Sequence, residues 1–248
     1  MDSNDTIISF EDVHKSFGSQ HILRGLSFEV KRGTTLGLMG GSGTGKSVAL
    51  RHIIGLLKQD SGSVQVDGNE MATITTKELH DLRLRMGYVF QSGALINWLT
   101  VAENLALPLQ ENSDLDAEEI ERRVREKLEM VYIPDAGEKF PSEISGGMKK
   151  RVALARALIT DPEIILYDEP NAGLDPQISA SINKLIRELS DKLGMTGLLV
   201  EHRIGCLKVI ADEVIFMYEG QALVHEPVGT FFKPTHPRLA AFLGGAEE

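Results

Sequence analysis

Apolar and polar residues alternate along the first thirty residues with the two-residue period of half-buried strands. Residues 6–13 and 22–30 both show this alternation. Phe17, Gly18 and Ser19 lie between them and have the composition of a turn. The pattern therefore predicts two strands joined by a tight connection, with Phe17 at its start.

A short, almost wholly apolar run follows at residues 34–39 and leads directly into a glycine cluster at residues 40–45. Runs of this kind are typical of strands that are buried on both faces of a parallel sheet. We expect a helix over residues 46–57 after the glycines, and further strands over residues 63–67 and 86–90.

The middle of the chain has a helical period on a heavily charged background. Within residues 116–130 the apolar positions Ile120, Val124 and Leu128 recur every four residues. Together with a second helical stretch at residues 148–159, this pattern predicts a helical insertion between strands. Strand and helix then alternate again, at residues 164–167 (strand), 178–193 (helix), 197–200 (strand) and 237–243 (helix). Such alternation predicts an α/β fold with a mostly parallel sheet.

Composition narrows the functional classes. The chain has 248 residues, and its 26 Lys and Arg against 36 Asp and Glu give a formal net charge of −10. A protein that binds nucleic acid through phosphate contacts normally carries the opposite sign, so we expect no nucleic-acid partner. Cys206 is the only cysteine, which excludes an internal disulfide and is typical of a cytosolic protein. The acidic, polar N-terminus is unlike a signal peptide, and no apolar run approaches the ~20 residues of a spanning helix.

The glycine cluster carries the first candidate chemistry. The run Gly40-Gly41-Ser42-Gly43-Thr44-Gly45-Lys46-Ser47 matches the phosphate-binding pattern G-x-x-x-x-G-K-[ST], with a strand before it and a helix after it. Glycines let backbone N–H groups turn toward an anion, and the helix N-terminus adds its positive end. Lys46 then supplies a charge for the terminal phosphates and Ser47 a hydroxyl for Mg²⁺. A glycine-rich turn without a ligand is the plainer alternative.

Two carboxylates end the strand at residues 164–167. Asp168 and Glu169 stand where α/β proteins place ligand sites, at the carboxyl edge of the sheet. Asp168 would hold Mg²⁺ through water, and Glu169 would polarise the attacking water. By itself, a strand followed by Asp-Glu is often only a strand that ends in turn residues, so this interpretation depends on the phosphate loop.

A second phosphate grip is predicted at the start of the helix near residue 146. Ser145 is placed as its N-cap, and Gly146 and Gly147 leave the first N–H groups open. A capped helix with a solvated basic face would explain the same residues. A chain with two such helix starts but one lysine-bearing loop suggests that the second grip serves a nucleotide on another copy.

These motifs, in this order, resemble the ABC ATPases. The resemblance runs from about residue 8 to residue 243 and includes Ile144-Ser-Gly-Gly-Met148, which is similar to the signature sequence of that family. It also includes Gln91, the stretch Asn171–Asp175 and His202. The resemblance implies a single ABC ATPase domain, with an antiparallel β subdomain at the N-terminus. Residues 1–90 and 161–248 would form the nucleotide-binding core, and residues 91–160 a helical subdomain that carries the signature.

The resemblance also assigns roles to individual residues. Phe17 would stack on adenine, Gln91 would sense Mg²⁺ and the terminal phosphate, and His202 would hold that phosphate and Glu169. The implied catalytic residues are Glu169, His202, Lys46 and Gln91. The implied nucleotide contacts are Phe17, Gly40, Gly41, Ser42, Gly43, Thr44, Gly45, Lys46, Ser47 and Val48, with Ser47, Gln91 and Asp168 at the metal. Ser145, Gly146, Gly147 and Asp175 would reach ATP across the seam of a head-to-tail homodimer.

Finer detail is similar to the lipid-transport ATPases associated with MCE proteins, the MlaF-like group. Met148 after the two glycines, the run from Phe90 to Leu95, and His236-Pro237-Arg238-Leu239 carry that likeness. It implies a separate membrane permease, an MCE-type substrate-binding protein and a small STAS-domain protein as partners. It places the chain on the cytoplasmic face of the inner membrane and makes a phospholipid or related lipid the substrate. Trp98, the only tryptophan, is predicted to line the groove that receives a permease helix.

Two residues depart from the family pattern. Asn171 stands where Thr or Ser is usual, and Arg203 follows His202 where Asp is common. Two alternatives of function stay open. One is the ATPase of an amino-acid or lipoprotein transporter, and the other is a soluble ABC-like ATPase such as an iron–sulfur assembly factor.

Overall fold

The structure is a computed structural model that describes residues 5–245 of the chain. The chain divides into two compact units. The first combines Met1–Leu79 with Thr196–Glu248, and the second is His80–Met195. The helix α2 (Thr76–Leu84) crosses the boundary between these units.

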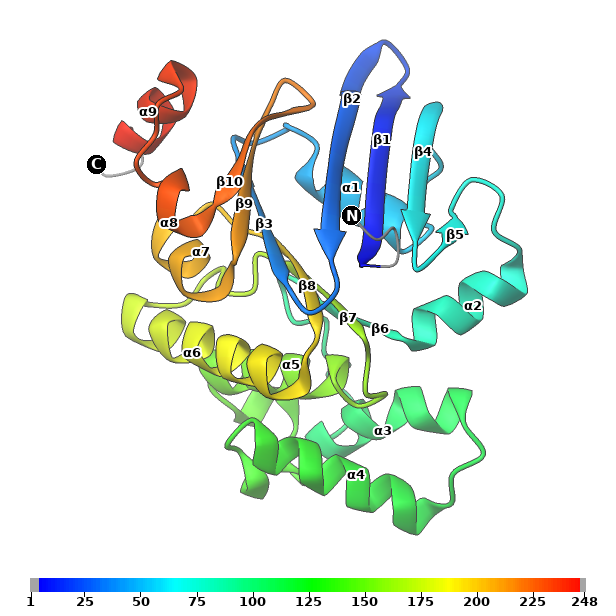
Figure 1. The fold of residues 1–248 in the computed structure, drawn as a ribbon. Coiled ribbons are helices and arrows are strands. Elements are labelled where there is room, and N and C mark those ends of the chain that lie inside the picture. Colours follow the sequence, from blue (N-terminus) through cyan, green and yellow to red (C-terminus); the bar gives the residue numbers. More distant parts are fainter. Residues whose placement is uncertain (1–4, 246–248) are drawn as a thin grey trace. The chain divides into compact units, whose positions relative to one another are not determined.

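The first unit contains an antiparallel sheet at its N-terminal end (Figure 1). Its strands are β1 (Thr6–Phe17), β2 (Gln20–Lys31), β4 (Ser61–Val66) and β5 (Asn69–Glu70), in the order β2-β1-β4-β5. Phe10 and Phe28 face each other across β1 and β2, with their rings stacked at 4.5 Å. The hairpin predicted from the alternation is therefore confirmed, and Phe17 is the last residue of β1.

The same unit contains a second group of four strands, one of which is β3 (Thr35–Gly40). Every residue of β3 is buried. The others are β8 (Thr196–Val200), β9 (Glu213–Tyr218) and β10 (Gln221–Pro227), in the order β10-β9-β3-β8. β3 runs parallel to both of its neighbours, and β10 is antiparallel to β9. The helices of this part are α1 (Lys46–Ile53), α7 (Ile204–Ile210), α8 (Val228–Phe231) and α9 (Pro237–Gly244).

The helix after the glycine cluster is shorter than the sequence predicts. It ends at Ile53 rather than at residue 57. Gly55 has a φ of +67°, outside the right-handed helical region, so the helix stops although apolar residues continue after it.

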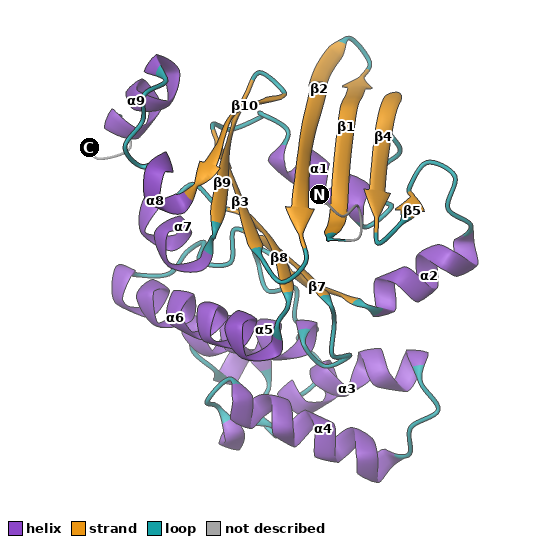
Figure 2. Ribbon diagram, viewed as in Figure 1, coloured by secondary structure: helices purple, strands orange, loops and turns teal. Residues whose placement is uncertain are grey.

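The second unit combines two parallel strands with a group of helices. β6 (Met86–Val89) pairs with β7 (Ile164–Asp168). Its helices are α3 (Val101–Asn112), α4 (Ala117–Met130), α5 (Gly146–Ala157) and α6 (Pro176–Leu193), with short 3₁₀ turns at Pro134–Ala136 and Pro141–Glu143. Figure 2 shows α3 and α4 side by side, and the predicted apolar face of α4 is buried.

The predicted class is confirmed, with parallel strands behind the phosphate loop, an antiparallel N-terminal sheet and an all-helical stretch within residues 91–160. Seven of these helices and strands were not predicted: α2, α3, α7, α8, β5, β9 and β10. Among the residues that the structure describes, no helix is both long and apolar enough to span a membrane.

Candidate functional site

The glycine cluster forms a tight loop between β3 and α1. A side chain at Gly40 would place its Cβ 2.4 Å from the carbonyl oxygen of Met217, and Gly45 has a φ of +101° with Leu23 packed against it. Only glycine is accommodated at these two positions. Gly45 caps α1 without a side-chain hydrogen bond, and the first turn of α1 contains no acidic residue. The helix start therefore keeps the positive, open character that suits a phosphate.

Lys46 is held over this loop. Its Nζ donates hydrogen bonds to the carbonyl oxygens of Gly40 and Gly41, both at 2.8 Å. The ammonium group thus lies on the loop, where its charge can neutralise an anion. Ser42 and Gly43 at the tip of the loop are exposed.

Two more predicted residues belong to the same unit. Phe17 is 46% exposed at the end of β1, with the Lys15 ammonium 5.7 Å from its ring centre. An exposed ring of this kind can stack on a base. His202 follows β8, and its side chain is 53% exposed. The structure leaves both side chains accessible for the roles that the sequence predicts.

The structure also shows the contacts of the Arg203 backbone, at a position where the sequence gives no reason for arginine. Its backbone N–H donates to the carboxylate of Glu201 at 3.1 Å, and Arg203 is the residue immediately before α7. The contact involves the main chain, so nothing in it requires arginine rather than aspartate.

In the second unit, the carboxyl end of β7 presents the two predicted carboxylates. The phenol of Tyr88 donates to Asp168 Oδ2 at 3.2 Å, and the amide of Gln91 donates to Glu169 Oε2 at 3.2 Å. Glu169 has a φ of +46°, a strained conformation for a residue with a side chain and one that is common at functional sites. Gln91 and Glu169, both predicted site residues, lie 78 positions apart in the sequence, and the structure brings them into contact.

The loop after Gln91 is fastened to α5 by two cations that sequence reasoning missed. Lys150 Nζ donates to the carbonyl oxygen of Gln91 at 2.5 Å. Arg156 donates to the carbonyl oxygens of Gly93 and Ala94, at 2.9 and 2.7 Å. Burial lowers the pKa of Arg156 from its ordinary value. The alternative of a solvated basic face does not describe these two cations of α5, because both bind main-chain carbonyl oxygens.

The start of α5 has the predicted geometry. The hydroxyl of Ser145 accepts a hydrogen bond from the backbone N–H of Met148 at 3.3 Å, which makes Ser145 the N-cap. Ser145 and Gly146 are exposed, whereas Gly147 is buried with Ile178 packed against it. One face of the helix start is therefore open to solvent.

The segment after Glu169 is anchored by the residue that departs from the family pattern. Asn171 is fully buried, and its amide donates to Asn183 Oδ1 on α6 at 2.5 Å. Asp175 caps α6 by accepting from the backbone N–H of Ile178 at 2.9 Å and is exposed. Asparagine at position 171 is explained, because its amide reaches a buried amide partner.

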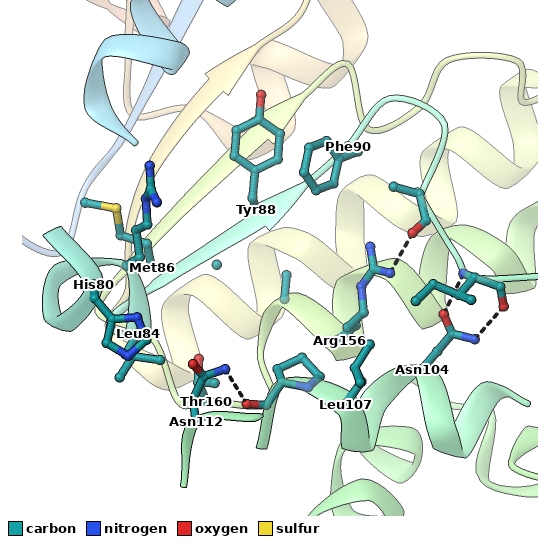
Figure 3. Close-up of a pocket in the computed structure, with 16 residues that line it drawn as sticks. His80, Leu84, Met86, Tyr88, Phe90, Asn104, Leu107, Asn112, Arg156 and Thr160 are labelled. Atoms are coloured by element: carbon teal, nitrogen blue, oxygen red, sulfur yellow. Dashed lines mark hydrogen bonds between the residues drawn. The ribbon is translucent and has the colours of Figure 1, made fainter. Parts of the chain in front are cut away.

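A groove of about 510 Å³ lies beside this region of the second unit (Figure 3). Aromatic and aliphatic residues line much of it, among them Tyr88, Phe90 and Leu107. His80, Arg83 and Arg156 are its basic residues, and none of its lining residues is acidic. Trp98 is not one of the lining residues. Its side chain is instead 80% exposed on a nearby loop.

That loop is itself well anchored. The side chain of Asn104, only 1% exposed, accepts from the backbone N–H of Ile96 at 2.8 Å and donates to the Ile96 carbonyl oxygen (Figure 3). It also donates to the carbonyl oxygen of Leu99. The loop is thus fixed on both sides of Trp98.

Comparison with known proteins supports these motifs. A family model described as "ABC transporter" matches residues 23–172. "Protein TRIGALACTOSYLDIACYLGLYCEROL 3, chloroplastic" of Arabidopsis thaliana is 40% identical over 260 residues, which cover 98% of this chain and 75% of the relative. "Probable ribonucleotide transport ATP-binding protein mkl" of Mycobacterium leprae is 37% identical over 238 residues, which cover 96% of this chain and 69% of that one.

A solved structure matches over most of the chain. It is described as "Dimeric structure of a post-hydrolysis state of the ATP-binding cassette MJ0796 bound to ADP and Pi", with a TM-score of 0.81 and 31% identity. The match covers 90% of this chain and 99% of that chain.

Proposed function

This chain belongs to the ABC transporter family and is an ATP-hydrolysing cassette of that family, and from this premise we propose that it drives a separate membrane permease for phospholipid or a related lipid. The observation that carries the motor assignment is the hydrogen bond between Gln91 and Glu169. It joins the water-polarising carboxylate to the loop that leads into the groove.

ATP, the substrate, is proposed to bind with its terminal phosphates on the loop of residues 40–45. The ammonium of Lys46 neutralises phosphate charge, and Phe17 stacks on the base. Mg²⁺ fits the donors that the chain offers, because a hydroxyl at Ser47 and a carboxylate at Asp168 are the oxygen ligands it prefers. The ion supplies neutralisation of the phosphate charge that grows during transfer.

Hydrolysis is proposed to use Glu169, Gln91 and His202. Glu169 orients and polarises the attacking water, and Gln91 holds the Glu169 carboxylate until nucleotide and metal engage it. His202 donates to the terminal phosphate. Positioning and charge stabilisation carry most of the rate enhancement in such reactions, so each residue acts without forming a covalent intermediate.

A second copy of the chain is proposed to complete the site. Ser145 and Gly146 are exposed at the open start of α5, which suits contact with a nucleotide held by a partner copy. The MJ0796 cassette with ADP and phosphate is dimeric, which supports this arrangement. ATP then joins the two copies because its terminal phosphate contacts both, and hydrolysis removes that contact.

The groove of Figure 3 is proposed to receive a helix of the permease. Its apolar lining suits a helix with an apolar face, and its basic residues suit acidic side chains on that helix. Trp98 would contact the permease beside the groove rather than inside it. The permease would hold the chain at the cytoplasmic face of the inner membrane.

The substrate class rests on resemblance. The Arabidopsis relative carries a galactolipid in its name and aligns with nearly the whole chain. An MCE-type protein and a small STAS-domain protein remain proposed partners. Ribonucleotide transport is the second candidate, because the Mycobacterium leprae relative carries that name and aligns almost as fully.

Transport by a reconstituted complex tests the two candidates. The chain would be purified in detergent with its permease and placed in vesicles of phosphatidylethanolamine and phosphatidylglycerol that contain a trace of fluorescent phospholipid. We expect ATP-dependent movement of the phospholipid, none with the Glu169→Gln variant, and no ATPase stimulation by uridine or adenosine monophosphate. Stimulation by a ribonucleotide without lipid movement would refute the lipid assignment in favour of the alternative.

A further inference from the structure

Next to His202 lies a buried carboxylate to which neither the sequence motifs nor the proposed function assigns a role. Glu201 directly follows β8, whose five residues are all buried, and its own side chain is 1% exposed. Its backbone N–H donates to the carbonyl oxygen of Leu38 in β3 at 3.2 Å. β3 is the strand that enters the phosphate loop, so Glu201 is fixed to the same framework. Burying a carboxylate is costly unless its hydrogen bonds or charge have a use.

The contacts of Glu201 converge on one oxygen. Oε1 accepts from the backbone N–H groups of His202 at 2.9 Å and Arg203 at 3.1 Å. The same oxygen lies 3.4 Å from Nδ1 of the His202 ring. The other oxygen, Oε2, is buried and has no hydrogen-bond partner among residues 5–245. The carboxylate is therefore directed entirely toward the turn that carries His202.

We propose that Glu201 is a positioning residue for His202, which keeps a proton on Nδ1 and thereby makes Nε2 the ring atom that faces the nucleotide. This inference rests on the proposed contact between His202 and the terminal phosphate. The two ring nitrogens of a histidine are not equivalent, and the group beside one of them decides which atom is presented to a ligand. Here the two hydrogen bonds from the main chain to Glu201 fix the backbone of His202, and the carboxylate charge beside Nδ1 fixes the tautomer of the ring.

The exposure of the two side chains supports this division of labour. His202 is 53% exposed, so its outer face can meet a ligand, whereas Glu201 is covered and cannot touch one. A residue that only capped the turn into α7 would need the main-chain bonds but no approach to the ring. The approach of the Glu201 carboxylate to within 3.4 Å of Nδ1 is what separates the positioning role from that simpler one.

Histidine NMR tests the tautomer without relying on catalysis. In ¹⁵N-histidine spectra of the nucleotide-free protein, assigned with His202→Ala, we expect His202 to carry its proton on Nδ1. Glu201→Ala should shift the ring toward the Nε2–H form that an unrestrained imidazole favours in water. Glu201→Gln, which keeps an acceptor oxygen of the same reach, should preserve the Nδ1–H form. An Nε2–H ring in the wild type would overturn the proposal, even if Glu201→Ala failed to fold.

Kinetics test the consequence. Glu201→Ala should lower kcat by about 10- to 100-fold, the range found where a carboxylate orients a ligating histidine. The KM for ATP should stay within about twofold, because a contact that matters mainly in the transition state appears in kcat. Glu201→Gln should recover much of the loss. If Glu201→Ala lowered the melting temperature but left kcat unchanged, Glu201 would be only a turn cap and the proposal would be wrong.

A matched pair in the same unit controls for removal of a glutamate beside a histidine. Glu213 accepts from His225 Nε2 at 2.8 Å at the β9–β10 edge. Glu213→Ala should leave ATPase activity unchanged. His202→Ala tests the role of His202 in hydrolysis separately, because wild-type activity in that variant would refute it. The NMR result would still decide whether Glu201 sets its tautomer.

Discussion

Lys150→Met is the sharpest test of how the loop after Gln91 is held. Lys150 is 7% exposed, and its ammonium donates a short bond to the Gln91 carbonyl oxygen. Methionine fills nearly the same volume, so the cavity term is small and the loss lies mainly in the bond. A hydrogen bond to a charged group contributes about 1.5–3 kcal/mol to the free energy of unfolding. For a chain of this length that corresponds to a fall in Tm of about 3–12 °C.

The same substitution has a predicted effect on activity. The Gln91 amide donates to Glu169, so a loosened loop leaves the carboxylate less well placed. We expect kcat to fall by about tenfold or more, since small misplacements of reacting groups have effects of that size. The affinity for ATP should change little, because the phosphate loop belongs to the other unit of the chain.

Lys149→Met provides the control for this experiment. Lys149 is the neighbouring residue on α5, is partly exposed, and makes no side-chain hydrogen bond or ion pair within residues 5–245. Thermal unfolding followed by circular dichroism and steady-state ATPase kinetics would be measured for both variants. If Lys150→Met melted and hydrolysed ATP like Lys149→Met, the contact between Lys150 and the loop would have no energetic importance.

Four further variants test the remaining assignments. Lys46→Ala should abolish ATP binding in calorimetry, and unchanged affinity would contradict the phosphate cradle. Glu169→Gln should keep ATP binding and lower kcat by about 10²- to 10⁴-fold. The variant should also elute from gel filtration as an ATP-bound dimer. Wild-type turnover would refute the role of Glu169. Trp98→Ala should weaken co-purification of the permease, and unchanged recovery and coupled ATPase activity would refute that contact. Burial lowers the pKa of His52 below 6.5. The unfolded chain therefore binds the extra proton, and stability should fall as pH drops through about 6.5; His52→Gln should flatten that fall in Tm, and an unchanged profile would exclude His52 as its source.

The motif residues could be predicted because their pattern is local. The phosphate loop, the carboxylates after β7 and the cap at Ser145 each occupy consecutive positions at the end of an element. Helix boundaries were less certain, since Leu56 and Leu57 continue the apolar pattern after Gly55 has ended α1. The residues that hold the site in place were not predictable in this way. Lys150 binds a carbonyl oxygen 59 positions away, and Arg156 binds two that are 62 and 63 away. Any residue offers a carbonyl, so no side-chain pattern marks such a partner.

These anchors share a physical logic. In the second unit a buried lysine binds the main chain at Gln91, and in the first a buried carboxylate binds the main chain at His202. Each anchor fixes the backbone of a residue that we propose to face the terminal phosphate, while the side chains of Gln91 and His202 themselves remain exposed. The side chain of a residue whose backbone is fixed can change partners when the terminal phosphate binds, while its Cα stays in place. Substituting Lys150 or Glu201 should therefore displace Gln91 or His202 without changing the chemistry of that side chain. Substituting Gln91 or His202 should instead remove the chemistry and leave the loop in place.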